Sequence, residues 1–86
     1  MQKVSEAIRS THGQDGAIVL DTRQGLMFKL NPVGSRILEL LKGGFDEAAI
    51  ADEISRQFEV SRDIANQDVD QFIHALKEHR LVEELK

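Results

Sequence analysis

The sequence predicts an α+β domain of the winged helix-turn-helix type, in which a three-stranded antiparallel sheet is followed by three helices. Two observations support this prediction. Near the N-terminus, short runs alternate apolar and polar residues between glycine-containing turns, which is typical of strands. The remainder of the chain places apolar residues at helical spacing behind residues that cap helices well.

The expected sheet is built from three short runs. Residues 1–11 alternate weakly and predict an outer strand. The two glycines and the aspartate within residues 12–16 predict a turn, because these residue types tolerate the backbone angles that a reversal needs. Residues 17–21 and 26–30 form the next two strands, joined by a tight turn at residues 22–25.

The register of this second hairpin follows from its turn. If Asp21 lies opposite Leu26, then Val19 lies opposite Phe28 on the same face. The other face then carries Ile18, Leu20, Met27 and Lys29. Because helices in so small a domain cover one face of a sheet, we expect this second apolar face either to be exposed or to lie beneath residues 1–11.

The first helix is expected over residues 32–42. Asn31 is a favourable N-cap, and Pro32 suits the first helical position, where its missing N–H costs nothing. The Gly43–Gly44 pair then permits a left-handed C-cap. The hairpin therefore leads directly into a helix.

Two further helices are expected, after the N-caps Asp46 and Ser61. The apolar tail of Leu81, Val82 and Leu85 either continues the last helix or folds back. The faces predicted to be buried are Val33, Ile37, Leu40 and Leu41 in the first helix, Ala49, Ile50, Ile54 and Phe58 in the second, and Val69, Phe72, Ile73 and Leu76 in the third.

Length and composition limit the possible functions. The 86 residues make a single domain, 1–86, too small for a deep catalytic cavity. The chain has no cysteine, only three histidines, and neither an HExxH nor a GxSxG motif. We therefore expect no enzyme, no catalytic residue, no metal site and no cofactor.

Charge and hydropathy narrow the class of partner. The net charge of −4 comes without a basic cluster, which argues against nucleic acid. No apolar run has the length of a membrane span, and the N-terminus has no signal-peptide core, so we expect no membrane partner and a cytoplasmic location.

The run GAIVLDTRQGLMFKLNPVGSRILELLKGG resembles the PqqD-like family, which has a Leu-Asp strand end, a glycine turn, an aromatic strand closing in Leu-Asn and a helix ending in glycine. The later run DVDQFIHALKEHRLV is similar to the last helix of that family. Together the similarity spans about residues 16–82. The chain departs from the family pattern at Arg80, where glycine is frequent, and at Met27, where an aromatic residue is frequent.

The resemblance implies a peptide-recognition domain. Members of the family hold the leader of a ribosomally synthesised precursor peptide, or RiPP, as an extra antiparallel strand between the third strand and the third helix. The LDTRQG turn is most similar to the stand-alone recognition elements of lasso-peptide pathways. The implied partners are therefore a precursor leader peptide and a separate processing enzyme, such as a leader peptidase, to which the domain presents the leader.

An exposed strand edge supports the same function on physical grounds, because its unpaired backbone groups can bind an extended peptide of any sequence. The residues expected to form the peptide site are Leu26, Met27, Phe28, Lys29, Leu30, Asp68, Val69, Phe72, Ile73 and Leu76. Several have a structural alternative. Leu30, Phe72 and Leu76 also fit a plain core, Lys29 fits a solvated strand charge, and Asp68 either faces water or pairs with Lys29.

Three other functions remain open. The second and third helices match a winged-helix DNA-binding regulator, although two acids interrupt the start of the third helix, which runs Arg62-Asp63-Ile64-Ala65-Asn66-Gln67-Asp68. A PqqD-type chaperone for a radical-SAM enzyme and an adaptor or oligomerisation module are the others. We expect a monomer or a weak homodimer.

Overall fold

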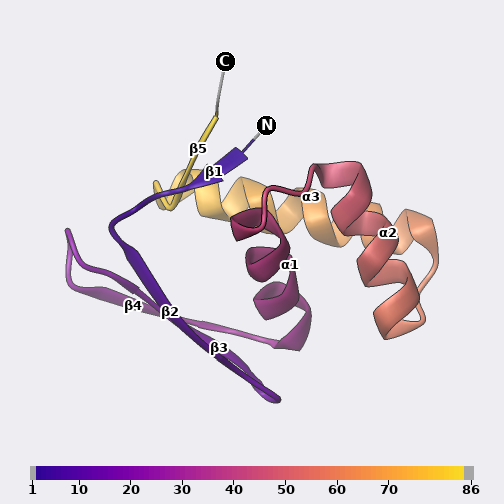
Figure 1. Cartoon of the computed structure of the whole chain (residues 1–86), viewed down its shortest axis with the longest axis horizontal. Coiled ribbons are helices and arrows are strands. Elements are labelled where there is room, and N and C mark those ends of the chain that lie inside the picture. The colour runs from indigo at the N-terminus through magenta and orange to yellow at the C-terminus, as the bar shows by residue number, and fades with distance from the viewer. Residues whose placement is uncertain (1, 85–86) are drawn as a thin grey trace.

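The computed structural model describes residues 2–84. A three-stranded antiparallel sheet packs against three helices, and all of the helices lie on one side of the sheet (Figure 1). The predicted fold class is therefore confirmed. The sheet consists of β2 (Ile8–Gly13), β3 (Gly16–Asp21) and β4 (Leu26–Leu30), and the helices are α1 (Pro32–Lys42), α2 (Glu47–Phe58) and α3 (Arg62–Glu78).

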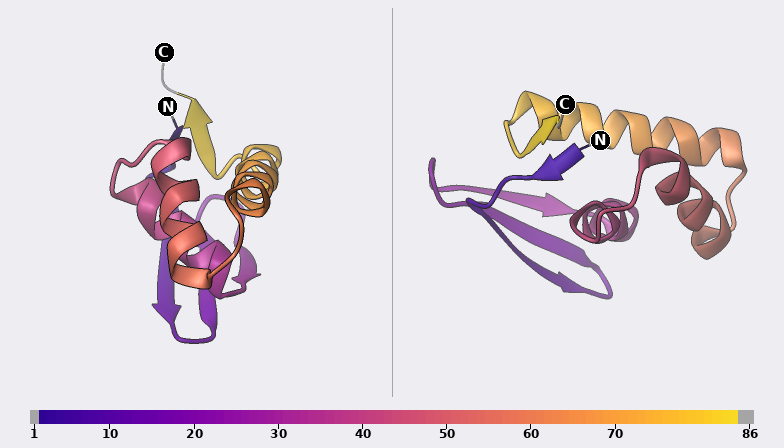
Figure 2. Two further views of the ribbon diagram at one scale, coloured as in Figure 1. Left: turned by 90° about the vertical axis from the view of Figure 1, so that its right-hand side faces the viewer. Right: turned by 45° about the horizontal axis from the view of Figure 1, so that its top comes forward.

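A second, two-stranded sheet was not predicted. β1 (Gln2–Val4) pairs antiparallel with β5 (Val82–Glu84), so the two ends of the described chain lie side by side (Figure 2). The expected outer strand over residues 1–11 is thus split into β1 and β2. The chain folds back after α3, because Leu81 and Val82 pack against the core and are only 3% and 6% exposed. Leu85 lies outside the described residues.

The predicted register of the second hairpin is confirmed, with Asp21 opposite Leu26. The turn expected over residues 12–16 is shorter than predicted, because β2 and β3 extend to Gly13 and Gly16 and leave two residues between them. Gly16 has a φ of 128°, and a Cβ atom there would lie 1.9 Å from the backbone oxygen of Leu30. Only glycine fits this close approach to the end of β4.

All three predicted N-caps are confirmed. The Asn31 side-chain oxygen accepts a hydrogen bond from the Gly34 N–H at 2.8 Å, and Asp46 and Ser61 cap α2 and α3 in the same way. α1 ends with Gly44 in the left-handed region at φ 88°. These caps satisfy backbone donors that the first turn of a helix leaves free, and they fix where each helix begins.

The core lies between the sheet and the helices. One predicted core residue is wrong: Ala49 is exposed, and its neighbour Ala51 is buried instead. At about 100° per residue, Ile50 and Ile54 fix the buried side of α2, and Ala49 falls on the opposite side. The fully buried large side chains include Ile37, Leu38, Ile50, Ile54, Val19 and Val69.

The second face of the sheet is exposed rather than covered by the N-terminal segment. β2 lies beside β3 in the same sheet, so residues 8–13 cannot lie beneath it. Ile18 is 45% exposed and Met27 is 67% exposed. Among residues 2–84, no helix is long and apolar enough to cross a membrane.

Candidate functional site

β4 is an edge strand of the three-stranded sheet. Bonded and non-bonded pairs alternate along an antiparallel ladder. The hydrogen bond of 3.0 Å from Thr22 N to Ala7 O therefore means that Leu20, Ile18 and Gly16 of β3 bond to β2. The intervening residues of β3 therefore bond to Leu26, Phe28 and Leu30. By the same alternation, the backbone N–H and C=O groups of Met27 and Lys29 point away from the sheet.

Side chains and backbone groups of β4 therefore have different roles. The side chains of Leu26, Phe28 and Leu30 lie on the helix side of the sheet and are partly exposed. Those of Met27 and Lys29 lie on the opposite, solvent-exposed side. The strand thus offers free backbone groups at its edge and apolar side chains toward α3.

Two hollows lie along α3, one near each end of β4: the first is between α1 and α3, and the second is between the β3–β4 turn and the end of α3. The hollow near the start of α1 has a volume of about 330 Å³, and we call it the Asn31 end; it is lined by Asn31, Val33, Gly34, Ile37, Asp68, Gln71 and Phe72. The other, of about 170 Å³, is called the Arg80 end; it is lined by Gln24, Leu26, Glu78, His79 and Arg80.

Phe28 lies along the strand between the two hollows and contacts α3. Its ring centroid is 4.9 Å from that of His79, with the ring planes tilted by 54°. β4 and the second half of α3 run antiparallel, because the start of the strand lies near the end of the helix and Asn31 lies near Asp68. We call the strip from the Arg80 end to the Asn31 end the edge groove.

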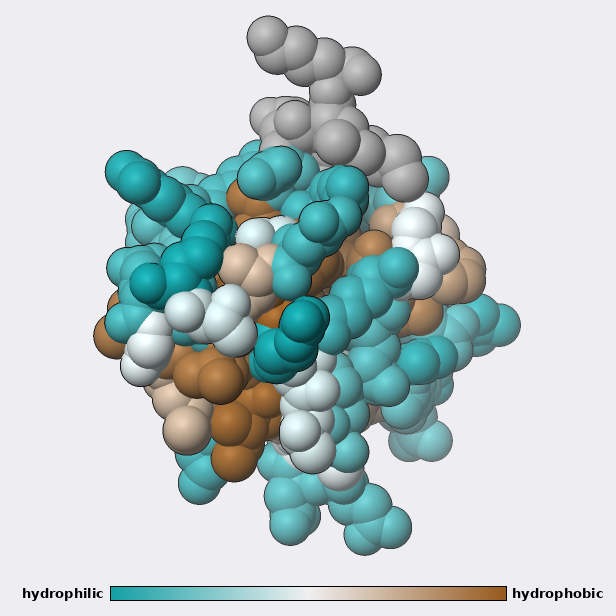
Figure 3. Space-filling view, turned by 60° about the vertical axis from the view of Figure 1, so that its left-hand side comes forward, coloured by the Kyte–Doolittle hydropathy of each residue, from teal (hydrophilic) through white to brown (hydrophobic). Residues whose placement is uncertain are grey.

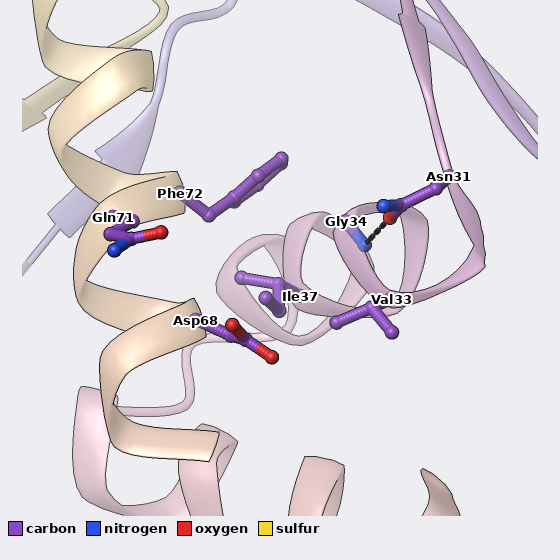
Figure 4. A pocket seen from close by; sticks show the side chains of 7 residues that line it. All are labelled: Asn31, Val33, Gly34, Ile37, Asp68, Gln71 and Phe72. Atoms are coloured by element: carbon purple, nitrogen blue, oxygen red, sulfur yellow. Dashed lines mark hydrogen bonds between the residues drawn. The ribbon is translucent and has the colours of Figure 1, made fainter. Parts of the chain in front are cut away.

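At the Asn31 end, α1 and α3 face each other across the hollow (Figure 4). Asp68, Gln71 and Phe72 project from α3, while Ile37 projects from α1 and supplies apolar surface. Gly34 leaves room for the Phe72 ring, since a Cβ atom there would lie 2.9 Å from its Cε1. Apolar walls with a few polar groups are typical of a site that accepts a side chain.

At the Arg80 end, a hydrogen-bonded cluster ties the sheet to the helix. The fully buried Asp21 carboxylate accepts hydrogen bonds from Arg23 Nε at 3.1 Å, Arg23 Nη2 at 3.2 Å and Gln24 Nε2 at 2.8 Å. Arg23 Nη2 also donates to the Arg80 backbone oxygen at 2.7 Å. Charge-assisted bonds of this kind hold the β3–β4 turn against the last turn of α3.

The hydrogen bonds from Arg23 dominate the electrostatics of this cluster. Together with a smaller contribution from the Gln24 hydrogen bond, and against the opposing effect of burial, they lower the pKa of Asp21 to about 2. The same interaction raises the pKa of Arg23. Asp21 is therefore ionised at neutral pH, and the pair remains charged.

The predicted site residues divide into three groups. Leu26, Phe28, Leu30, Asp68 and Phe72 are partly exposed along the edge groove. Met27 and Lys29 reach the edge through their backbones only. The remaining three, Val69, Ile73 and Leu76, are at most 4% exposed and lie in the core behind the groove, as the structural alternative for Leu76 anticipated.

Several groove residues were not predicted. Asn31 and Gly34 come from the start of α1, Gln71 comes from α3, and His79 is the residue that caps the end of α3. The α3 residues could have been found by extending the face of Asp68 and Phe72 at helical spacing of three, four and seven residues. Asn31 was recognised only as a cap. Among the described residues no ion pair joins Lys29 to Asp68.

The three histidines of the described chain make separate contacts. His79 packs on Phe28, and His74 pairs with Glu78 on the surface of α3 at 3.1 Å. His12 belongs to β2 and reaches α1 with its side chain, whose ring nitrogens lie 2.9 Å from Ser10 Oγ and 2.6 Å from the buried Ser35 Oγ. These bonds fasten α1, which carries one wall of the Asn31 end, to the sheet.

Comparison with known proteins gives consistent results. The family model described as "Coenzyme PQQ synthesis protein D (PqqD)" matches residues 16–82. A solved structure of TbiB1 in complex with the TbiA(beta) leader peptide is 34% identical, with a TM-score of 0.88 over 98% of each chain. A lasso peptide synthetase B1 complexed with the leader peptide is 25% identical, with a TM-score of 0.85 over 96% of this chain and 98% of that one. No curated protein matches the chain. The resemblance inferred from the sequence is confirmed.

Proposed function

Because the chain belongs to the PqqD family, we propose that it is a RiPP recognition element that binds the leader region of a ribosomally synthesised precursor peptide. The observation that carries this proposal is the similar structure with a bound leader peptide, which matches 98% of this chain at 34% identity. The second similar structure, a lasso peptide synthetase B1, favours a lasso-peptide precursor.

The edge groove supports a specific mode of binding. The leader adds to β4 as a fourth antiparallel strand, and its backbone pairs with the outward-facing groups of Met27 and Lys29. Its side chains then alternate between the outer side of the sheet and the groove. Those that face the groove contact Leu26, Phe28 and Leu30 on one side and Phe72 and His79 on the other. These contacts hold the peptide in one register.

The chain itself performs no bond chemistry in this proposal. It raises the local concentration of the leader and fixes its register for a separate processing enzyme, such as a leader peptidase. A DNA-binding role has less support, because the exposed start of α3 carries Asp63, and Asp68 and Asp70 follow on the same helix. Acidic groups at this position would repel phosphates.

The test is a fluorescence-anisotropy titration of a labelled leader peptide from the precursor encoded beside this chain. Phe28→Ala should weaken binding by at least about tenfold, because the ring is the apolar centre of the groove. Phe45→Ala is the matched control, since Phe45 is 51% exposed and lies in the α1–α2 loop away from the groove. Thermal unfolding of both variants shows that they remain folded.

Two outcomes would contradict the proposal. One is a wild-type protein that binds the leader no better than a scrambled peptide of the same composition. The other is a protein that binds a generic DNA duplex in its place, with binding reduced by changes at the start of α3.

A further inference from the structure

The outer face of the sheet, on the side away from the helices, carries a small apolar surface. The cross-strand row of Leu20 and Met27 lies beside Ile18, and all three side chains point away from the core. Ile18 is 45% exposed and Met27 is 67% exposed. Seen from the side of the sheet, brown apolar groups gather at the lower left of the view and are bordered by teal hydrophilic ones (Figure 3).

The charged side chains that the three strands place on this outer face are both cations, Arg9 and Lys29. One acid lies nearby, because Asp15 in the β2–β3 turn lines a hollow with Ile18 and Lys29. Arg9 lies opposite Leu20, and Lys29 lies opposite Ile18, so one cation stands at each side of the apolar row. Neither cation forms an ion pair within the described chain. An apolar centre flanked by free cations is unexpected in a chain with a net charge of −4.

We propose that this outer face docks the enzyme that processes the bound leader, through an apolar patch edged with acidic residues on that enzyme. This inference rests on the proposed function. Charge complementarity selects the chemistry of the partner, because an acidic rim would pair with Arg9 and Lys29. A second copy of the chain would bring the same two cations and be repelled.

The position of the face also fits this partner. The leader would form the next strand beside β4, so an enzyme seated on the outer face lies next to the peptide on which it acts. Three strands of about five residues give a face of roughly 250 Å². That is well below the roughly 800 Å² per partner of a stable complex. The docking is therefore transient, and the adjacent leader completes the surface.

The test uses the double variant Arg9→Glu/Ile18→Thr, which changes β2 and β3 but no residue of the edge groove. The matched control is Arg56→Glu/Ile64→Thr. The exposed fraction of Ile64, 49%, is similar to the 45% of Ile18, and Arg56 is exposed on α2. Two quantities are measured for each protein. One is the affinity for the leader peptide, and the other is the rate at which a leader peptidase cleaves the precursor at limiting chain concentration.

We expect the outer-face variant to bind the leader within twofold of wild type and to lower the cleavage rate at least fivefold, with no change in the control. A wild-type cleavage rate would overturn the inference. A loss of leader affinity in the outer-face variant would also overturn it, because the face would then act through the groove. So would binding of the wild-type protein to phosphatidylglycerol vesicles, if the outer-face variant no longer binds them. Failure of the wild-type chain to bind leader would instead refute the proposed function itself.

Discussion

The two ends of the edge groove are built differently. The Arg80 end is small, about 170 Å³, and Arg23 fastens it by bonding both to the buried Asp21 and to the backbone oxygen of Arg80. The Asn31 end is larger, about 330 Å³, and no comparable cluster of charged groups within residues 2–84 ties its two walls together. Its shape depends instead on the Phe72 ring, which packs against the open surface at Gly34.

This difference assigns separate tasks to the two ends. A rigid Arg80 end fixes where the strand edge stands relative to α3, and therefore sets the register of an added peptide. The Asn31 end has more room beside the Phe72 ring, so the peptide side chain that it receives can be larger. Changes at the Asn31 end should alter affinity more than stability, and changes at the Arg80 end should do the reverse.

The largest effect is expected outside both hollows, where the backbone of β3 comes close to the end of β4. Gly16→Ala places a methyl group 1.9 Å from the Leu30 backbone oxygen at a φ of 128°. We expect it to lower the free energy of unfolding by about 3 kcal/mol. Chemical denaturation measures this, and Gly13→Ala is the control, because a Cβ there meets nothing within 4 Å. Equal losses in both variants would show that the end of β4 imposes no special constraint.

Gly34→Ala separates affinity from stability. The new Cβ would lie 2.9 Å from Phe72 Cε1, so the ring must move into the hollow. The gain of about 1 kcal/mol in helix propensity offsets that displacement, and we expect the unfolding free energy to change by less than about 1 kcal/mol. Leader affinity, measured by anisotropy, should fall about tenfold. Unchanged affinity would mean that the Asn31 end accepts no part of the peptide.

Arg23→Gln tests the cluster at the Arg80 end through pH. Arg23 lowers the folded-state pKa of Asp21 from 3.8 to about 2. The unfolded chain therefore binds a proton first as the pH falls, and the contribution of Asp21, fully present above about pH 4, is lost between about pH 4 and pH 2. Stability of the variant should depend less on pH across this window, as measured by urea unfolding. Identical pH profiles would contradict the role of Arg23.

Arg80→Gly should have the smallest effect. Arg80 adopts a φ of 60°, which costs less for glycine than for any residue with a Cβ atom. We expect an increase of about 1 kcal/mol in the free energy of unfolding. Glu59→Gly, at φ 55° in the C-cap of α2, is the comparison. A loss of stability at position 80 alone would show that the arginine side chain contributes more there than the strain it causes.

Much of the fold could be predicted because its signals are local. The register of the second hairpin follows from one turn and one alternating pattern, and each helix begins behind a cap that hydrogen-bonds within three residues. The ribbon of β1 and β5 could not be predicted in this way. It joins residues about 80 positions apart in pairs such as Gln2 with Glu84, and each strand is only three residues long.

The candidate site shows the same limit. The strand edge and Phe72 were predicted from local alternation and helical spacing. His79 was not, because its contact with Phe28 depends on how α3 crosses the sheet. Lys29 was expected among the residues that bind the peptide, yet its side chain lies on the outer face, since successive residues of a strand point to opposite sides. In this strand, position in the alternation determines the role of a residue more than its chemical type.

The most direct test of the central claim, that the leader adds as a strand to β4, is amide hydrogen exchange resolved by residue. The N–H groups of Met27 and Lys29 point to the open edge, while that of Phe28 already bonds to β3. Saturating leader peptide should slow exchange at Met27 and Lys29 at least about tenfold more than at Phe28. Bound leader with unchanged exchange at Met27 and Lys29 would contradict strand addition at this edge.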